Sequence, residues 1–467
     1  MFRVFQHRTS GTHFVELFAD GALCFAAVLL SAVTLARQDA IGLAQAATPA
    51  IFLSALAFAL VMALMYSFVG LYRHRNLGLS STVLRVCFVF VVGGYITYLA
   101  AKYIQYDGYA SRLVGYALVY LTGGLAVYRG VAWTLRQKMG ARRVMIVGTG
   151  ADASQVWSDL TAPELRAGYE VVGFFPTSDG HEVPERVEGG RVFDRRRDML
   201  DLVRQHGISE IIVAEREQRG GGVPMEQLLE CRISGVPILD LAGFYERTRA
   251  EVPVDSLKAS WLIYGDGFAQ GRLRAATKRL FDVVSSSVLL LLASPVMLLT
   301  ALAIRLDSRG PVLYQQERVG MAGEGFMCIK FRSMRTDAEK DGVARWATKN
   351  DSRITRVGEF IRKTRIDELP QLFSVLRGEM SMVGPRPERP SFVAQLKEQI
   401  PFYDVRHTVK PGLTGWAQVR YAYGASLEDA RRKHQFDLYY VKNNSLLLDL
   451  QVLIETVSVV LFREGAH

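Results

Sequence analysis

Four apolar stretches open the chain, and they constrain its fold more than any other feature. They cover about residues 14–36, 49–72, 83–104 and 111–132. Each is close to the roughly 20 residues that a helix needs to cross the hydrocarbon layer of a bilayer. The pattern therefore predicts an α-helical membrane bundle of four transmembrane helices over residues 1–140.

Basic residues beside these stretches give the bundle an orientation. Arg3 and Arg8 precede the first stretch, a basic run at 73–75 follows the second, and a basic run at 136–143 follows the fourth. Because positive charge is enriched on the cytoplasmic side of a membrane, both ends of the bundle are expected to face the cytoplasm. The soluble remainder of the chain would then also be cytoplasmic.

Two acidic residues, Glu16 and Asp20, lie near the start of the first stretch. A carboxylate facing lipid is costly, so we expect both to lie close to the interface or to face neighbouring helices. A proton or ion pathway is the alternative interpretation.

The overall charge and the cysteines narrow the class of protein. The net charge is +10, and many lysines and arginines stand beside apolar runs, which favours lipid headgroups and phosphates over nucleic acid as partners. The four cysteines are far apart and form no CxxC pair. The sequence therefore indicates neither a zinc site nor a disulfide framework.

After Gly140 the pattern changes to short apolar runs that alternate with polar helical stretches, which is typical of an α/β layer fold. Strands are predicted at 144–147, 170–175, 210–214 and 237–239. The first runs into Gly148-Thr149-Gly150, with Ala153 at the third position of a dinucleotide-binding fingerprint. We expect a Rossmann-like domain over residues 141–260, and nucleotide binding there stays open because the motif alone is weak.

A second uncharged apolar run covers 283–304. Basic residues stand at both ends, and Ser294-Pro295 stands in the middle. Proline removes a backbone donor and bends a helix, and the Ser294 hydroxyl can bond a carbonyl that the bend frees. The pattern is compatible with an ordinary kinked span or with a re-entrant helix over 278–306 that returns to the side it entered from.

The region 311–386 is dense in charged residues spaced by glycine and proline, and it contains the pair Asp367 and Glu368. Pro370 and an apolar stripe that starts at Leu369 predict that a helix begins here, with Asp367 at or near its N-cap. A plain capping aspartate is the simplest interpretation of an isolated Asp-x-x-Pro. A second carboxylate next door and three nearby arginines favour a site for a divalent metal and phosphates instead. These arginines are Arg362, Arg365 and Arg386.

Several long motifs occur in order through the C-terminal part. They are KRxxD at 278–282, Ser294-Pro295, KFRSM at 330–334, DELPQ at 367–371, PRP at 385–387 and KPGLTGW at 410–416. With these motifs, residues 272–467 resemble the catalytic domain of the bacterial sugar transferase family, the monotopic phosphoglycosyl transferases that act on polyprenyl phosphate. The leading helices and the Rossmann-like region resemble the large form of the family, and RYAYGA at 420–425 resembles a subgroup from exopolysaccharide systems. The family usually has asparagine where this chain has Ser374, which puts local hydrogen bonding in doubt.

The resemblance implies an α/β phosphoglycosyl transferase domain that starts exopolysaccharide or glycoconjugate synthesis at the cytoplasmic face of a bacterial inner membrane. Its donor would be a UDP-sugar, its acceptor undecaprenyl or another polyprenyl phosphate, and its surroundings membrane lipids, with a homodimer as the expected assembly. A cytosolic donor also favours the re-entrant helix, because one more crossing would place residues 306–467 outside.

The resemblance also implies roles for individual residues. Asp367 would be the nucleophile that forms a phosphosugar-aspartyl intermediate and releases UMP, and Glu368 would be a ligand of Mg²⁺. Arg362 and Arg386 would hold phosphate oxygens. Further candidates for donor contacts are Lys330, Arg332 and Arg353.

Two other functions remain as alternatives. A membrane-bound NAD-dependent nucleotide-sugar dehydratase would need a Tyr-x-x-x-Lys pair, which residues 141–260 lack. A non-catalytic membrane scaffold would not need the intact Asp367-Glu368 pair. The sequence does not identify the sugar of the donor, although the resemblance favours glucose or galactose.

Two C-terminal features can be interpreted in two ways. The apolar segment 446–462 is interrupted by polar residues, so we expect an interfacial or packed helix. Trp416 and Tyr439-Tyr440 can anchor at a membrane surface or pack in the core.

Overall fold

The computed structural model forms two compact units, Met1–Thr248 and Arg249–His467. The residues that it describes are 8–38, 48–68, 79–105, 109–138, 141–163, 165–166, 168–177, 186–187, 190–215, 222–257, 262, 267–268, 271–336, 338, 353–421, 424 and 426–462. The basic run at 73–75 and half of the RYAYGA motif lie outside these residues.

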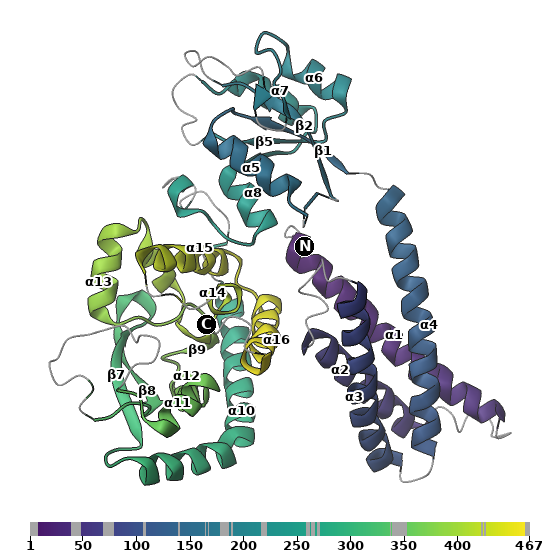
Figure 1. Cartoon of the computed structure of the whole chain (residues 1–467), viewed down its shortest axis with the longest axis vertical. Coiled ribbons are helices and arrows are strands. Elements are labelled where there is room, and N and C mark those ends of the chain that lie inside the picture. The colour runs from purple at the N-terminus through teal and green to yellow at the C-terminus, as the bar shows by residue number, and fades with distance from the viewer. Residues whose placement is uncertain are drawn as a thin grey trace. The chain divides into compact units, whose positions relative to one another are not determined.

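Four long helices open the first unit, as the sequence predicts (Figure 1). They are α1 (Arg8–Gln38), α2 (Pro49–Phe68), α3 (Leu79–Gln105) and α4 (Tyr109–Lys138). Among the described residues, α1 and α3 contain segments long and apolar enough to cross a membrane, and α2 contains a shorter apolar segment. The apolar helices indicate a membrane-associated protein, while four crossings stay a prediction.

An ion pair links the first and last of these helices. Asp20 on α1 is only 2% exposed, and its Oδ2 lies 3.0 Å from a guanidinium nitrogen of Arg129 on α4. The expectation that Asp20 faces a neighbouring helix is confirmed. The side chain of Glu16 lies outside the described residues.

The same unit contains a parallel four-stranded sheet with the order β2-β1-β5-β6. The strands are β1 (Arg142–Val147), β2 (Tyr169–Phe175), β5 (Glu210–Val213) and β6 (Ile238–Asp240), with a small antiparallel pair formed by β3 (Arg186–Val187) and β4 (Gly190–Arg191). The four predicted strands and the α/β layer fold are confirmed. Gly148 ends β1 with φ +121°, a conformation that favours glycine and turns the chain toward the next helix.

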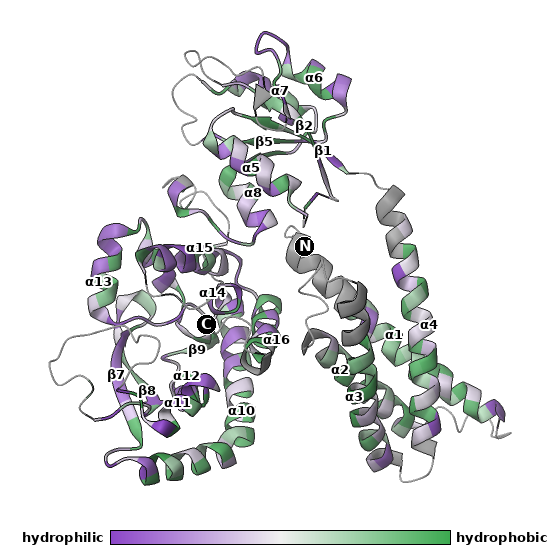
Figure 2. Cartoon of the chain, in the orientation of Figure 1, coloured by the Kyte–Doolittle hydropathy of each residue, from purple (hydrophilic) through white to green (hydrophobic). Residues whose placement is uncertain are grey.

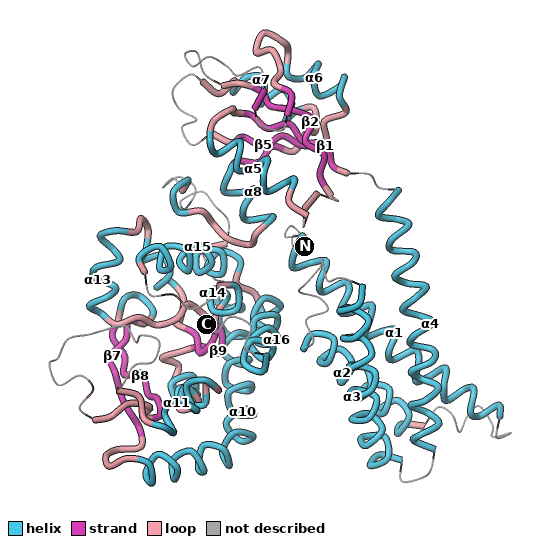
Figure 3. The backbone as a smooth tube through the Cα atoms, in the orientation of Figure 1, coloured by secondary structure: helices cyan, strands magenta, loops and turns pink. Residues whose placement is uncertain are grey.

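Helices cover both faces of the sheet (Figure 3). Helices α5 (Ala151–Thr161) and α8 (Leu241–Thr248) pack on one face, against Val144 and Ile146. Helices α6 (Met199–His206) and α7 (Met225–Ile233) pack on the other, against Met145 and Val147. Successive side chains of β1 therefore point into two apolar layers, one on each face of the sheet, as in a sheet buried on both sides.

The second unit contains the charged motifs of the sequence. Its elements are η2 (Val254–Ser256), α10 (Arg272–Asp307), β7 (Leu313–Val319), η3 (Met321–Gly323), β8 (Gly325–Phe331), α11 (Arg356–Lys363), η4 (Ile366–Glu368), α12 (Gln371–Arg377), β9 (Ser381–Val383), α13 (Pro390–Gln399), η5 (Tyr403–Thr408), β10 (Gly412–Thr414), α14 (Trp416–Arg420), α15 (Leu427–Asn443) and α16 (Leu446–Phe462). Strands β7 and β8 form an antiparallel hairpin, and β9 pairs in parallel with β10.

Large aromatic side chains fill the core of this unit. Trp416, Tyr439 and Tyr440 are each 1% exposed, and the rings of Trp416 and Tyr439 stack 5.7 Å apart. Core packing is therefore the correct one of the two interpretations of these residues. Helix α16 also packs, because Leu448 and Val452 belong to the same core.

Residues 249–257, which the sequence assigns to the end of the Rossmann-like region, pack in the second unit. The indole Nε1 of Trp416 donates to the carbonyl of Ala250 at 2.8 Å, and Val252 and Val254 are buried in the core. The second unit therefore begins at Arg249, where the chain starts to pack in its core, and not at the end of the region that the sequence pattern indicates.

Helix α10 bends, and Figure 1 shows it as two arms that meet at an angle. Pro295 has no N–H for the carbonyl of Leu291, and the Ser294 hydroxyl donates to that carbonyl at 2.8 Å. The predicted role of Ser294 at the kink is thus confirmed. Figure 2 shows that most residues around the bend are hydrophobic, and many of their side chains are exposed.

The buried His434 on α15 provides a test of this fold. Its ring lies 5.1 Å from that of Tyr403, and burial, followed by the charge of Arg406, lowers its pKa to about 3. Because the pKa in the fold lies below that in the unfolded chain, the stabilisation is complete above about pH 6.5 and is lost as the pH falls toward 3. We expect His434→Phe, which keeps a ring, to reduce this loss by up to roughly 1.4 kcal/mol per pH unit.

The measurement is the thermal unfolding midpoint of the detergent-solubilised protein at pH 7 and pH 5. The midpoint should drop less in His434→Phe than in the wild type. Equal drops in both proteins would contradict a neutral buried imidazole.

Candidate active site

Asp367 and Glu368 lie in a tight turn between α11 and α12. They belong to the single 3-10 turn η4, and Arg365 before it has the left-handed φ of +58°. The N-cap of α12 is Pro370, so Asp367 lies near the start of this helix, as the sequence predicts, and three residues before the N-cap itself. Proline at the N-cap ends the 3-10 turn, because the ring restricts the backbone and offers no N–H.

Both carboxylates are buried, with 8% exposure for Asp367 and 7% for Glu368. Among the described residues, the buried Oδ1 of Asp367 has no hydrogen-bond partner. Burial and the charge of Glu368 raise the pKa of Asp367 to about 6, against the opposing effect of Lys330, Arg365 and Arg362. Asp367 thus combines a free oxygen atom with raised basicity.

Glu368 has the opposite environment. Its Oε1 lies 2.9 Å from a guanidinium nitrogen of Arg386, 3.1 Å from Nζ of Lys330 and 3.7 Å from a guanidinium nitrogen of Arg365. Burial alone would raise the pKa of Glu368, but Arg386, Lys330 and Arg365 together hold it well below its usual value. Glu368 is therefore ionised at neutral pH.

The three cations come from separate segments of the chain. Lys330 lies on β8, Arg365 precedes η4, and Arg386 follows β9. The three cations outnumber the two carboxylates, so the cluster keeps a positive charge even when both acids are ionised. Its members are Lys330, Arg365, Asp367, Glu368 and Arg386. Such a cluster suits a phosphorylated ligand.

A fully buried ion pair lies behind Arg386. Arg406 pairs with Asp437 at 2.8 Å and donates to the backbone carbonyl of Arg386, also at 2.8 Å. The phenol of Tyr403 accepts a further hydrogen bond from Arg406 at 2.6 Å. Arg406 thereby fixes the backbone that presents Arg386 to Glu368.

The remaining predicted site residues take different places. Arg362 is on α11, close enough to lower the pKa of Asp367. Arg332 is 5% exposed and donates to Ser308 and to the carbonyl of Arg309 at the C-terminal end of α10. Arg353 donates to the carbonyl of Ala338. The contacts of Arg332 and Arg353 are with the protein's own loops, and donor binding by either stays a prediction.

Ser374 on α12 is fully buried. Its hydroxyl has no hydrogen-bond partner among the residues that the structure describes. A serine at this position therefore leaves one buried polar atom without a partner among the described residues.

The two carboxylates are the groups here that could hold a metal ion. Within the described part of the chain, no group of three or more His, Cys, Asp or Glu side chains gathers as a metal site. Mg²⁺ commonly takes one or two protein carboxylates and completes its shell with water and substrate phosphates. The free oxygen of Asp367 beside Glu368 fits such a shared ion and does not fit a metal cage made of protein alone.

Sequence reasoning missed Arg406 with Asp437, whose partners are 31 positions apart and share no motif. It gave Lys278 and Arg279 a role only as the basic flank of the apolar run, and Asp282 only a place in a motif. A sequence signal was nevertheless present. Asp282 stands one turn after Lys278 at the start of an apolar helix, and a carboxylate that is buried there needs a hydrogen-bonding partner.

Comparisons with known proteins match both units. Residues 273–463 match the family model described as bacterial sugar transferase, and residues 67–216 match one described as a CoA-binding domain. The UDP-glucose:undecaprenyl-phosphate glucose-1-phosphate transferase of Escherichia coli (strain K12) is 34% identical over 74% of this chain and 74% of its own length.

Two further relatives match over smaller parts of their length. The UDP-N-acetylgalactosamine-undecaprenyl-phosphate N-acetylgalactosaminephosphotransferase of Aeromonas hydrophila is 42% identical over 51% of this chain. The undecaprenyl-phosphate glucose phosphotransferase of Komagataeibacter xylinus is 34% identical over 70%. The chain spans 56% and 60% of the length of these two relatives.

Proposed function

Because the chain belongs to the bacterial sugar transferase family, we propose that it transfers a hexose-1-phosphate from a UDP-sugar to undecaprenyl phosphate or a similar polyprenyl phosphate. The relatives' names support this substrate pair, and they include both glucose and N-acetylgalactosamine. The reaction would start an exopolysaccharide or another glycoconjugate.

The different environments of the two neighbouring carboxylates carry this proposal. Asp367 is buried, has an oxygen free of hydrogen bonds and has a raised pKa, which are properties of a nucleophile. Glu368 is held ionised by three cations. Asp367 can thus react, while Glu368 holds the three cations in place beside it.

In the proposed first step, a carboxylate oxygen of Asp367 attacks the phosphorus that bears the sugar. The bond from this phosphorus to the bridging oxygen of the diphosphate breaks, and UMP leaves with the electron pair. A phosphosugar-aspartyl enzyme remains. In the second step a phosphate oxygen of the polyprenyl phosphate attacks the same phosphorus, and the Asp367 carboxylate leaves, giving a polyprenyl diphosphate sugar.

The cations would bind phosphate oxygens in both steps. Lys330, Arg365 and Arg386 already point their charges at Glu368, and Arg362 stands close by on α11. A diphosphate bound beside Glu368 would share these donors. Arg406 contributes by holding the carbonyl of Arg386 and not by touching substrate.

Mg²⁺ is the cofactor that we propose, with Glu368 as ligand and Asp367 adjacent. When bound, it would neutralise charge on the diphosphate and so reduce its repulsion of an attacking carboxylate. The cations around Glu368 orient that carboxylate in the absence of substrate.

We also propose that α10 is a re-entrant membrane helix. A straight helix of its 36 residues would be roughly 54 Å long. Instead, Lys278 near its beginning contacts β9, and Ser308 after its end contacts Arg332, within the same compact unit. A helix that dips into one leaflet, bends at Pro295 and returns accounts for both contacts. Together with the basic residues that flank the leading helices, this proposal would place the catalytic unit on the cytoplasmic face of a bacterial inner membrane.

The alternatives gain no support. The family model and the relatives named above do not favour an NAD-dependent dehydratase or a scaffold. Nucleotide binding by the Rossmann-like region and a homodimer stay predictions.

Replacement of the nucleophile tests the proposed activity. Membranes with the wild-type protein, a panel of labelled UDP-sugars, undecaprenyl phosphate and Mg²⁺ should release UMP and form a labelled lipid. Asp367→Asn should lower this rate by at least roughly 1,000-fold, because an amide cannot form the intermediate. The matched control is Asp201→Asn, the same change on the exposed side of α6. Labelled lipid formed at the wild-type rate by Asp367→Asn would refute the nucleophile.

The pKa of Asp367 predicts a pH dependence. The carboxylate must be ionised to attack, so kcat/KM should fall about tenfold per pH unit below about pH 6. The measurement is kcat/KM between pH 5 and pH 8, with samples held at pH 5 and returned to pH 7.5 to check that the loss is reversible. A flat profile across this range would contradict a nucleophile with a raised pKa.

Labelling tests the re-entrant helix. Single cysteines at the exposed positions Leu273 and Arg309, in a background with Cys87→Ser, should react with a membrane-impermeant maleimide from the same side of the membrane. The measurement compares vesicles of both orientations. Labelling of the two positions from opposite sides would establish a crossing helix instead.

A further inference from the structure

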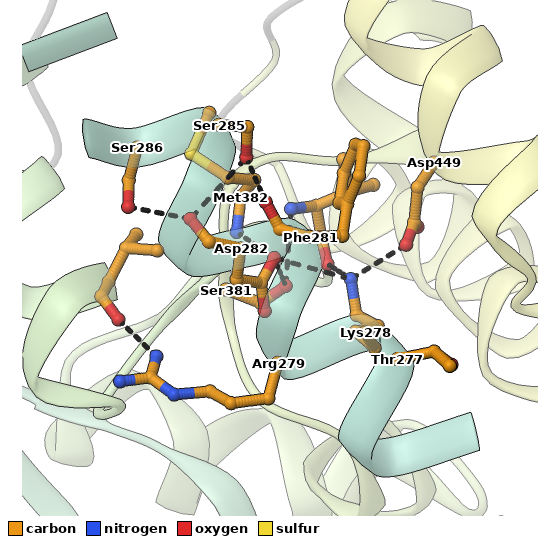
Figure 4. A network of polar contacts seen from close by, with 12 residues as sticks. Thr277, Lys278, Arg279, Phe281, Asp282, Ser285, Ser286, Ser381, Met382 and Asp449 are labelled. Carbon is orange, nitrogen blue, oxygen red and sulfur yellow. Dashed lines mark hydrogen bonds and ion pairs between the residues drawn. The ribbon is translucent and has the colours of Figure 1, made fainter. Parts of the chain in front are cut away.

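Three polar residues near the beginning of α10 contact the chain segment that separates Glu368 from Arg386. They are Lys278, Arg279 and Asp282, and Figure 4 shows them reaching in different directions from the same helix. The segment contains α12 and then β9. Each of these two elements receives its own set of hydrogen bonds from α10.

Arg279 binds the C-terminal end of α12. Its two terminal nitrogens donate to the carbonyls of Val375 and Leu376, both at 2.6 Å. These carbonyls belong to the last turn of a helix, where backbone donors run out and a cation is favoured, although that of Val375 also accepts from the backbone N–H of Gly378 at 3.0 Å. The other end of this seven-residue helix begins at Gln371, and only Leu369 and Pro370 separate it from Glu368. Arg279 therefore fixes the far end of the helix that follows η4, the turn that carries both carboxylates.

Asp282 binds the beginning of β9. Its Oδ1 accepts hydrogen bonds from the hydroxyl of Ser381 at 2.9 Å and from the backbone N–H of Met382 at 3.0 Å. Asp282 is 2% exposed and Ser381 is fully buried. A carboxylate this deeply buried is costly unless it is hydrogen-bonded, so these bonds define the position of the strand.

Lys278 binds the end of β9. Its Nζ donates to the carbonyl of Val383 at 3.2 Å and pairs with Asp449 of α16 at 2.8 Å. The hydroxyl of Tyr440 lies 2.9 Å from the same carbonyl and 2.7 Å from Asp449, so its single proton is shared between these two acceptors. Gly384 and Pro385 are the next residues, and Arg386 follows them. The end of β9 that leads to Arg386 is thus held by two donors.

Apolar contacts would anchor α10 without this set of directional bonds. Buried ion pairs and buried carboxylates add little net stability compared with well-packed apolar groups, although they can specify one arrangement. Here the specified elements are the two that place Glu368 and its partner Arg386. We propose that Lys278, Arg279 and Asp282 are positioning residues for the transfer reaction, through which the bent membrane helix sets the distance between the carboxylate pair and Arg386. This inference rests on the proposed function.

Pairs of variants separate positioning from folding. Asp282→Asn keeps an oxygen acceptor for Ser381 and Met382, whereas Asp282→Leu removes it. Arg279→Lys keeps the charge but loses the paired donors, and Arg279→Met loses both. Arg272→Met is the matched control, because it removes an equal charge from an exposed position of the same helix.

The first readout is kcat and KM for the UDP-sugar that the wild type uses, per mole of folded, membrane-inserted protein. Displacement of a reacting group by about 1 Å can lower a rate about 100-fold, so we expect Asp282→Leu and Arg279→Met to lose kcat by up to this factor. Asp282→Asn should stay within about threefold of the wild type, since its acceptor remains. Arg272→Met should match the wild type.

The second readout does not need activity. Hydrogen exchange followed by mass spectrometry should show faster exchange at residues 381–386 in Asp282→Leu, with wild-type exchange in α15. If Asp282→Leu does not insert into the membrane, the same measurement is made on Arg279→Met. Faster hydrogen exchange is then expected at residues 371–378.

The outcomes separate the two proposals. Inactivity of the wild type on the whole panel of UDP-sugars refutes the proposed function and, with it, the positioning role. Activity of the wild type with unchanged kcat and unchanged exchange in both Asp282→Leu and Arg279→Met overturns the positioning role alone. Failure of Asp282→Asn to restore the kcat lost in Asp282→Leu also overturns the assigned hydrogen bonds.

Discussion

The ionised carboxylate of Glu368, with three cations around one oxygen atom, is the interaction on which the site depends. Lys330, Arg365 and Arg386 approach it from a hairpin, a tight turn and the loop after β9. Two adjacent buried acids would otherwise repel each other and one would be neutral. Because the cations stabilise the charge on Glu368, Asp367 is the carboxylate whose pKa is raised. The different roles proposed for the two neighbouring carboxylates thus follow from the electrostatics at the point where three segments of the chain meet.

The same unit must also hold an apolar helix that bends near its middle. Pro295 creates the bend, and the Ser294 hydroxyl compensates for the hydrogen bond that the bend removes. Each end of the helix is bound to the polar part of the unit, by Asp282 near the beginning and by Arg332 at the end. The protein therefore joins a surface suited to lipid and a site suited to phosphates without a linker between them. A reaction between a nucleotide sugar and a lipid phosphate requires such a junction.

Sequence patterns with a fixed period or a fixed motif were reliable guides to this protein. The long apolar helices, the four parallel strands and the kink at Pro295 follow from local rules of hydrophobic period and backbone hydrogen bonding. The pair Asp367 and Glu368 could be singled out because two acids beside a helix start, with arginines nearby, are unusual for a surface turn. Individual cations were harder to assign. Lys330 and Arg332 are two residues apart in one motif, yet one contacts Glu368 and the other caps the end of α10.

By itself the sequence determined the order of the parts, their secondary structure, and the residue types available for chemistry. Only the tertiary structure decided which cations reach Glu368, that Trp416 is core, and that Arg406 supports Arg386 from behind. The physical reason is that these contacts join positions far apart in the chain, and their strength depends on burial and direction, which no local pattern records. A charged side chain near a motif has many possible partners, and packing selects one.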